Sequence, residues 1–262
     1  MTSTAPSATD SLRPGAQIAL ACLDLTLLND HDTAADVTRL CQRAQTRFGP
    51  VAAVCVWPHF VAQARAALPA PIAVAAVANF PHGSSDVGAA VQDAQQIVQA
   101  GGNEVDLVLP WRALQSGNDA AVLQLLTAVR QACPGARLKV ILETGALQTP
   151  ALIGRACALA LQAGADFLKT STGKTPISAT PEAAALMLQA IAQGHHHHVG
   201  FKASGGIRTA QDAMVYEALV AQYLGSQALQ PKRFRIGASS LLDDLEALLG
   251  QTRATPQAPG SY

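Results

Sequence analysis

Short apolar segments and longer segments of helical periodicity alternate along most of the chain. The short segments are rich in β-branched and other apolar residues, which is typical of buried strands. We predict strands at residues 18–25, 51–56, 72–78, 104–109, 138–143, 166–170, 199–202 and 234–237. The intervening segments space their apolar residues for helices at residues 32–47, 59–68, 85–100, 118–132, 149–163, 181–193, 209–224 and 239–249. This alternation predicts a parallel sheet covered by helices.

The number of repeats decides between two architectures. Eight strand–helix repeats without a break in composition favour one closed (β/α)8 TIM barrel, which commonly takes about 250 residues. A glycine-rich dinucleotide fingerprint after the first strand would favour an open doubly wound sheet, and the sequence has no such motif there. We expect a single α/β barrel over residues 16–250, between a flexible N-terminal tail at 1–15 and a C-terminal tail at 251–262.

Composition and charge narrow the class of protein. The 18 basic residues equal the 18 acidic ones, which argues against a nucleic acid or an anionic membrane as partner. Apolar residues make up 49% of the chain, enough for a large core. The five cysteines lack the close pairing of zinc or redox motifs, and residues 1–17 lack the pattern of a signal peptide. We expect reduced thiols and a cytoplasmic location.

Polar residues in the predicted strands are the first candidates for chemistry, because a barrel carries its active site at the carboxyl ends of its strands. Side chains two positions apart share a face of a strand. If the more apolar face of each strand packs under the helices, Lys169, Lys202, Asp106 and Asp24 all point into the barrel.

Two lysines inside one barrel are energetically unfavourable as purely structural residues, because a buried ammonium group must be paired or lose its proton. A nucleophilic amine needs its pKa lowered from about 10.4 by about three units. A second cation about 4 Å away opposes protonation by about 4 kcal/mol at an effective dielectric constant near 20. The pair suits a lysine that forms a Schiff base with a carbonyl, beside a carboxylate that moves protons. Alternatively, a lysine at a strand end is a solvated charge at the rim or half of an ion pair, in which Asp24 or Asp106 simply neutralises Lys202.

Small residues, hydroxyl groups and glycines follow the sixth, seventh and eighth predicted strands. Such loops present backbone N–H groups to phosphate, and barrel enzymes often bind phosphate there. Lys174 or Arg208 would supply the positive charge. The candidate phosphate-binding segments are therefore residues 170–174, 203–208 and 237–240.

Several longer motifs resemble deoxyribose-phosphate aldolase, a family of class I Schiff-base aldolases. The resemblance runs from about Leu23 to Leu249 and rests on LDLTLLND (23–30), NFPHG (79–83), NEVDLVLPWRAL (103–114), LKVILETG (138–145), ADFLKTSTGK (165–174), VGFKASGGIRTA (199–210) and FRIGASSLL (234–242). It implies that Lys169 is the Schiff-base nucleophile, that Lys202 lowers its basicity and that Asp106 relays protons. It also implies a role for Asp24 in the charge network around Lys202. The phosphate contacts that it implies fall on Gly173, Lys174, Gly205, Gly206, Arg208, Ser239 and Ser240.

The C-terminal tyrosine and one substitution bear on the resemblance. The resemblance implies that Tyr262 can fold over the mouth of the barrel and assist proton transfer. Ala203 stands where the best-known branch of the family has proline, so we expect a looser turn and altered efficiency. The run His195–His198 resembles a metal-binding tract, but consecutive side chains diverge and the run precedes the seventh strand. We interpret it as a solvated loop away from the site.

Other candidates are assigned structural or secondary roles. Cys55 ends the second strand without a visible histidine partner and is interpreted as a core or near-site thiol. His82 either touches substrate or closes its own loop. Lys139 and Glu143 share strand parity and are expected to form an ion pair.

These observations predict reversible cleavage of 2-deoxy-D-ribose 5-phosphate to D-glyceraldehyde 3-phosphate and acetaldehyde, without metal or organic cofactor. The partners would be small phosphorylated sugars and short aldehydes, and the resemblance suggests a homodimer. One alternative is a phosphosugar isomerase or epimerase that forms no covalent intermediate. The other is a non-catalytic barrel that binds a sugar phosphate.

Overall fold

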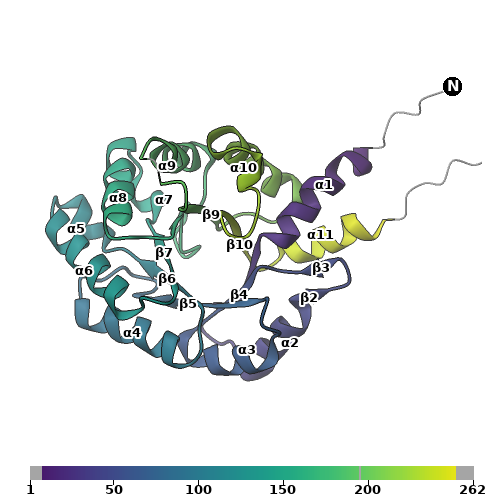
Figure 1. Cartoon of the computed structure of the whole chain (residues 1–262), viewed down its shortest axis with the longest axis horizontal. Coiled ribbons are helices and arrows are strands. Elements are labelled where there is room, and N and C mark those ends of the chain that lie inside the picture. The colour runs from purple at the N-terminus through teal and green to yellow at the C-terminus, as the bar shows by residue number, and fades with distance from the viewer. Residues whose placement is uncertain (1–7, 195, 252–262) are drawn as a thin grey trace, which may run out of the picture.

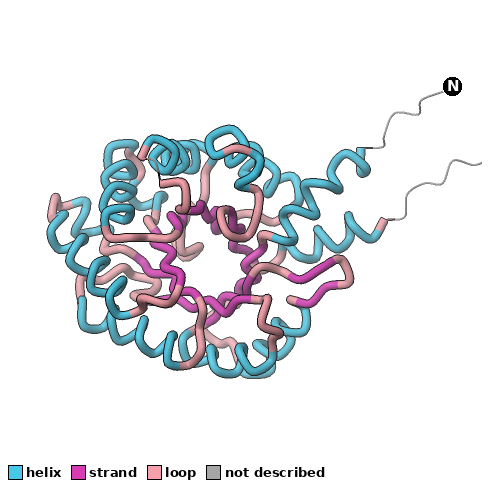
Figure 2. Tube along the Cα trace, viewed as in Figure 1, coloured by secondary structure: helices cyan, strands magenta, loops and turns pink. Residues whose placement is uncertain are grey.

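Eight parallel strands form a closed barrel in the computed structural model, which describes residues 8–194 and 196–251. The ring of strands, surrounded by helices, is seen end-on in Figure 2. Around the barrel the order is β1-β10-β9-β8-β7-β6-β5-β4, and β1 pairs with β4 to close it. The barrel strands are β1 (Leu23–Thr26), β4 (Ala53–Val56), β5 (Ala73–Ala78), β6 (Glu104–Val108), β7 (Arg137–Ile141), β8 (Phe167–Lys169), β9 (Gly200–Ser204) and β10 (Phe234–Ala238). The predicted (β/α)8 TIM barrel is confirmed.

Helices cover the outside of the barrel (Figure 1). The longer ones are α1 (Ala8–Ala21), α2 (Ala34–Arg43), α3 (Val61–Ala67), α4 (Val87–Gln99), α6 (Asp119–Ala132), α8 (Pro150–Gln162), α9 (Pro181–Gln193), α10 (Ala210–Leu224) and α11 (Leu241–Gly250). Short elements lie in the connections: η1 (Pro58–Phe60), α5 (Trp111–Gln115), α7 (Thr144–Leu147), η2 (Ser226–Ala228) and a hairpin of β2 (Gln45–Thr46) and β3 (Gly49–Pro50). The first strand of this hairpin occupies the last residues of the helix expected at 32–47, and α2 ends at Arg43.

The alternation of side chains along the strands separates the core from the barrel interior. Val105 and Leu107 of β6 point outward into the continuous apolar core beneath the helices, as do the outward residues of the other strands. Asp106 lies between them and points inward, where it contacts charged groups from other strands. Inward parity therefore places polar groups in the interior, as predicted.

The N-terminal segment differs from the expected tail. Residues 8–15 form the first half of α1, and residues 18–21, expected to begin a strand, form its last turn. Ala16, Ala19 and Leu20 are fully buried and three or four positions apart, the spacing of a helix face. Arg13 ties the helix to the end of α11 by donating to the carbonyls of Leu249 (2.9 Å) and Gln251 (2.7 Å).

Helix starts carry the capping residues that the sequence suggests. The side chain of Thr180 accepts a hydrogen bond from the N–H of Ala183, and Pro181 occupies the first turn of α9. These caps fix where the loop after β8 ends and α9 begins, which leaves residues 170–180 at the carboxyl end of the barrel. No helix in the described ranges has the length and apolar character needed to span a membrane.

Candidate active site

The lysines and carboxylates predicted to enter the barrel meet in its interior. Lys169 of β8 donates to Oδ2 of Asp106 at 2.7 Å. Lys202 of β9 donates to the same oxygen at 2.7 Å and to Oδ2 of Asp24 at 2.6 Å. All four side chains are buried, with at most 3% of the side chain exposed. The parity of the strands therefore brings these residues together.

The side-chain nitrogens of Lys169 and Lys202 are close neighbours, because each contacts the same carboxylate oxygen at 2.7 Å. The pKa of Lys169 is lowered, first by burial and in part by the charge of Lys202, against the opposing effect of Asp106. Lys202 thus acts in the direction expected, but burial is the larger cause. A buried amine of lowered pKa has a larger neutral, nucleophilic fraction near neutral pH.

The neighbours of Lys169 keep their charges. Burial disfavours the ammonium form of Lys202, but Asp106 and Asp24 outweigh it and raise the pKa of Lys202. Burial likewise opposes ionisation of Asp106, yet Lys139, Lys169 and Lys202 hold the pKa of Asp106 well below its usual range. Lys202 is therefore a stable cation and Asp106 a stable anion beside the nucleophile.

Three further charged residues belong to this network and were missed as site residues by the sequence reasoning. Lys139 of β7 donates to Asp24 (3.0 Å) and Asp106 (2.9 Å), and its Nζ lies 2.5 Å from Oε2 of Glu104. Arg235 of β10 binds Oδ1 of Asp24 at 2.5 Å and Oε1 of Glu104 at 2.7 Å. Inward parity of their strands was the signal that could have found them.

Charge balance within this buried network favours a neutral Lys169. With Lys169 uncharged, the buried cations Lys139, Lys202 and Arg235 are matched by the buried anions Asp24, Glu104 and Asp106, and the partly exposed Arg137 adds a positive charge 2.6 Å from Glu104. Protonating Lys169 would add an unmatched positive charge in a region of low polarity, which is unfavourable.

The expected ion pair between Lys139 and Glu143 is wrong. β7 ends at Ile141, and Glu143 has φ 57°, so the alternation of a strand no longer applies there. The carboxylate of Glu143 instead accepts the hydroxyl of Thr172 at 2.5 Å. Lys139 points to the interior carboxylates.

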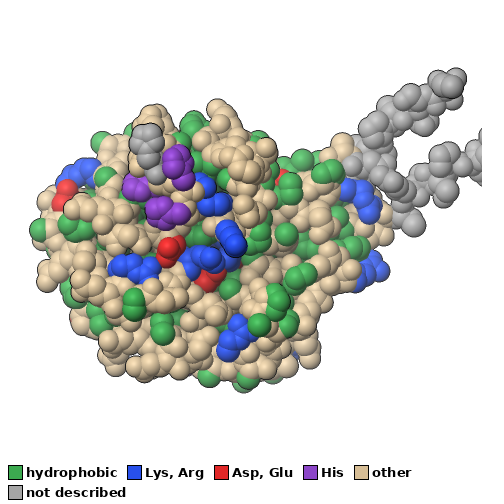
Figure 3. All heavy atoms as spheres, in the orientation of Figure 1, with side chains coloured by type: hydrophobic (Ala, Val, Ile, Leu, Met, Phe, Trp, Pro, Cys, Tyr) green, Lys and Arg blue, Asp and Glu red, His purple; other side chains and the backbone are tan. Residues whose placement is uncertain are grey.

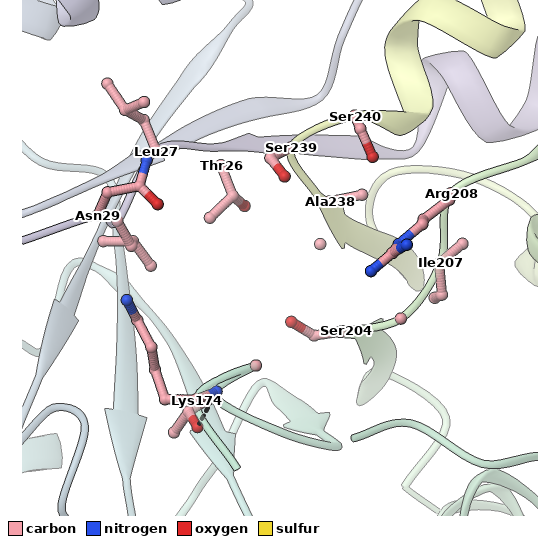
Figure 4. Close-up of a pocket in the computed structure, with 16 residues that line it drawn as sticks. Thr26, Leu27, Asn29, Lys174, Ser204, Ile207, Arg208, Ala238, Ser239 and Ser240 are labelled. Carbon is pink, nitrogen blue, oxygen red and sulfur yellow. Dashed lines mark hydrogen bonds between the residues drawn. The ribbon is translucent and has the colours of Figure 1, made fainter. Parts of the chain in front are cut away.

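The candidate phosphate residues line one cavity of about 270 Å³ at the carboxyl ends of β1, β8, β9 and β10. Its lining includes Gly173, Lys174, Gly205, Gly206, Arg208, Ser239 and Ser240. In Figure 4, Arg208 reaches into the cavity, while Lys174 lies across from it and extends toward Asn29. Thr26, Leu27, Leu28 and Asn29, after β1, complete the wall and were not predicted.

The backbone around the cavity is suited to an anion. Gly173, Gly205 and Gly206 have φ between 79° and 86°, a left-handed conformation that glycine adopts without strain. Ser240 precedes α11, so the N-terminal end of that helix lies at the cavity. A Cβ on Gly237, another lining residue, would lie 3.0 Å from Cε of Lys202. The anion cavity is therefore adjacent to the side chain of Lys202.

Three other residues considered from the sequence are Cys55, His82 and Tyr262. Sγ of Cys55 lies 3.9 Å from Oδ2 of Asp106, and burial, with Asp106 as a second cause, raises the pKa of the thiol to about 11. It is a near-site thiol, as interpreted. The backbone carbonyl of His82 accepts from Arg112 at 2.8 Å, and His82 is not among the residues that line the cavity. Tyr262 lies outside the described residues, and its role stays a prediction.

Ala203 does not lie in a turn. It is buried within β9 and pairs with Ile236 of β10, so the strand continues through the position where a looser turn was expected. The next residue, Ser204, reaches the cavity, and its N–H donates to Oγ of Thr170 at 3.0 Å.

The histidine run precedes β9, at the amino end of the barrel. The rings of His196 and His198 lie 6.4 Å apart, and the carbonyl of His197 accepts from Arg233. Figure 3 shows histidine side chains gathered beside charged side chains on one face of the molecule. The run therefore lies away from the cavity, as predicted, while His195 is outside the described residues.

Comparison with known proteins places this geometry in a family. The model of the DeoC/LacD family aldolases matches residues 18–247. The chain belongs to this aldolase family. A deoxyribose-phosphate aldolase of Agrobacterium fabrum (strain C58 / ATCC 33970) is 45% identical over 251 residues, which cover 95% of this chain and 96% of the relative.

Two solved structures resemble this DeoC/LacD family aldolase. A Toxoplasma gondii ME49 protein, described as a candidate deoxyribose-phosphate aldolase, superimposes with a TM-score of 0.85 at 23% identity, covering 93% of this chain and 97% of its own, and shows the fold. A tetrameric deoxyribose phosphate aldolase of Aeropyrum pernix has a TM-score of 0.72 and 26% identity, with 92% and 98% coverage. The homodimer expected for this chain stays a prediction.

Proposed function

We propose that this aldolase reversibly cleaves 2-deoxy-D-ribose 5-phosphate to D-glyceraldehyde 3-phosphate and acetaldehyde through a Schiff base on Lys169. The main observation behind this proposal is the buried amine of Lys169, which has a lowered pKa and donates a hydrogen bond to Asp106. A cavity suited to phosphate lies nearby, at the carboxyl ends of the strands. The name of the Agrobacterium fabrum relative supports this substrate.

The reaction follows from the chemistry of an imine. The neutral amine of Lys169 attacks the aldehyde carbon of the substrate, and loss of water gives a protonated imine. A base removes the proton of the 3-hydroxyl group, and the C2–C3 bond breaks. C3 to C5 leave as D-glyceraldehyde 3-phosphate, and the electron pair of the bond moves into the imine to give an enamine. Protonation of the enamine carbon gives the imine of acetaldehyde, and hydrolysis of this imine takes up one water, releases acetaldehyde and restores Lys169.

The charged neighbours divide the proton transfers. Asp106 is ionised and touches Lys169, so it is the group suited to accept a proton. Lys202 is cationic and touches the same oxygen, so it is suited to donate one and to stabilise negative charge. Asp24 holds Lys202 in place through its 2.6 Å contact.

Trapping the imine tests the proposal directly. Incubation with acetaldehyde and borohydride is expected to reduce the imine to a stable ethyl-lysine, found by peptide mapping at Lys169. Labelling at another lysine would overturn the assignment. An isomerase or epimerase without a covalent intermediate would show no label, and a non-catalytic barrel would bind the sugar phosphate without cleaving it.

Removing Lys202 is expected to move the pH dependence of trapping. Lys202→Leu deletes the cation that opposes protonation of Lys169, so the pKa of Lys169 should rise. Because the neutral amine reacts, the midpoint of trapping should shift upward by about one to two pH units. Lys139 still contacts both Asp24 and Asp106, so neither carboxylate is left without a cation.

The control is Lys232→Leu, which removes an exposed lysine near the amino end of β10. This variant should retain the wild-type profile. An unchanged midpoint in Lys202→Leu would show that Lys202 does not set the basicity of Lys169.

A further inference from the structure

Glu143 is a buried carboxylate that does not line the cavity but contacts residues that do. Its oxygens accept the hydroxyl of Thr172 at 2.5 Å and lie 3.3 and 3.4 Å from the backbone N of Thr172. Oγ of Thr175 lies 3.2 Å from Oε1, but its single proton has a nearer acceptor in the carbonyl of Ile177 at 2.9 Å. Glu143 is fully buried and is not among the residues that line the cavity, whereas Thr172 is. Its contacts therefore go to the loop that follows β8.

The hydrogen bonds continue from Glu143 into the backbone of the phosphate cavity. Oγ of Thr172 donates to Glu143 and accepts the N–H of Lys174 at 3.0 Å. Gly173 lies between these two residues and lines the cavity with φ 79°. The conformation of residues 172–174 is thus fixed on both sides of Gly173 by a chain of bonds that begins at Glu143.

The segment that carries Glu143 is itself held against the same loop. The N–H of Leu142 donates to the carbonyl of Lys169 (2.9 Å), and the N–H of Thr144 donates to that of Thr170 (3.0 Å). A Cβ on Gly145 would lie 2.0 Å from the carbonyl oxygen of Ile177, so the two loops are in backbone contact there. With φ 57° and ψ 59°, Glu143 adopts the left-handed conformation despite its side chain. Non-glycine residues in that conformation cluster at functional sites.

We propose that Glu143 is a positioning residue that sets the affinity for the substrate's phosphate by shaping residues 172–175 without touching the sugar. This inference rests on the proposed function for its substrate. A carboxylate suits the place because it offers acceptors alone to the hydroxyl and the backbone N–H of Thr172. A glutamine would direct an N–H toward one of them and weaken the arrangement.

The test compares two substrates that differ in the phosphate. In Glu143→Gln, KM for 2-deoxyribose 5-phosphate should rise about tenfold, the effect of losing about one charge-assisted hydrogen bond. The kcat should stay within about threefold, and kcat/KM for unphosphorylated 2-deoxyribose should be unchanged. Glu182→Gln, the same substitution at an exposed position of α9, is the control and should match the wild type. An equal loss with both substrates, or no loss with either, would overturn the proposal.

Two further measurements keep the test decisive. Thr172→Val removes the hydroxyl that Glu143 accepts and should raise the same KM, while Thr172→Ser keeps the hydroxyl and should restore it. This pair serves if Glu143→Gln fails to fold. Calorimetric titration with inorganic phosphate needs no catalysis and should show affinity reduced about tenfold in Glu143→Gln. Wild-type phosphate binding without cleavage of either sugar would defeat the proposed function alone. Unchanged phosphate affinity in the variant would defeat the role of Glu143.

Discussion

Lys169→Met is expected to lower kcat/KM for cleavage of 2-deoxyribose 5-phosphate by at least about 10³-fold, because the nucleophile of the covalent route is lost. Labelling by acetaldehyde and borohydride should disappear with it. Methionine keeps most of the volume of the lysine stem, and Asp106 retains its contacts with Lys139 and Lys202. The fold should therefore persist, and steady-state kinetics on the folded variant measure the loss.

The matched control for this substitution is Lys232→Met, at an exposed site away from the barrel interior. It should retain wild-type turnover and labelling. Retention of more than a tenth of the wild-type kcat/KM in Lys169→Met would contradict a Schiff base at this residue. Phosphate affinity should be unchanged, since Lys169 is not among the residues lining the anion cavity.

Asp106→Asn is expected to slow cleavage by about 10²- to 10⁴-fold while imine trapping at Lys169 persists. Asp106 is the carboxylate bonded to Lys169, and its charge raises the pKa of that amine. An uncharged amide would therefore leave Lys169 easier to deprotonate and still able to form the imine. Turnover falls because the amide accepts no proton, and comparing labelling with kcat separates the two roles.

The same substitution is expected to destabilise the protein. Asp106 accepts hydrogen bonds from Lys139, Lys169 and Lys202 in a fully buried place. Removing one partner of a buried charge network costs about 3–5 kcal/mol in the free energy of unfolding. Because the pKa of Asp106 is lower in the folded than in the unfolded state, its contribution is fully present above the unfolded pKa of about 4 and is lost as pH falls through the folded value.

Urea unfolding between pH 5 and pH 8 measures this effect, and the difference between wild type and Asp106→Asn should be constant over that window. The control is Asp243→Asn, whose carboxylate is 70% exposed in a surface pair with Arg43. Surface pairs contribute about 0–1 kcal/mol, so this variant should differ little from wild type. Equal stability of the wild type and Asp106→Asn would contradict the charge balance inferred for the barrel interior.

The sequence by itself determined the barrel, its strands and the inward direction of the principal residues. A buried strand alternates strictly, so Lys169, Lys202 and Asp106 had to share the interior once the apolar faces packed beneath the helices. The loops after β8, β9 and β10 could be assigned to one cavity because parallel strands end at one rim. The alternation of residues within a strand and the order of strands and loops along the chain are enough to predict these features.

Only the tertiary structure decided which inward residues touch and where the strand rule stops. Parity gives the face of a residue and not its height, and the stagger of the strands is what joins Arg235 and Glu104 to Asp24. The left-handed backbone at Glu143 moves it from an expected partner of Lys139 to the phosphate loop. In α1, burial of Ala16 and Leu20 against the body of the protein overrode a segment whose composition also suits a strand. These outcomes depend on contacts between residues far apart in the chain, which local patterns do not encode.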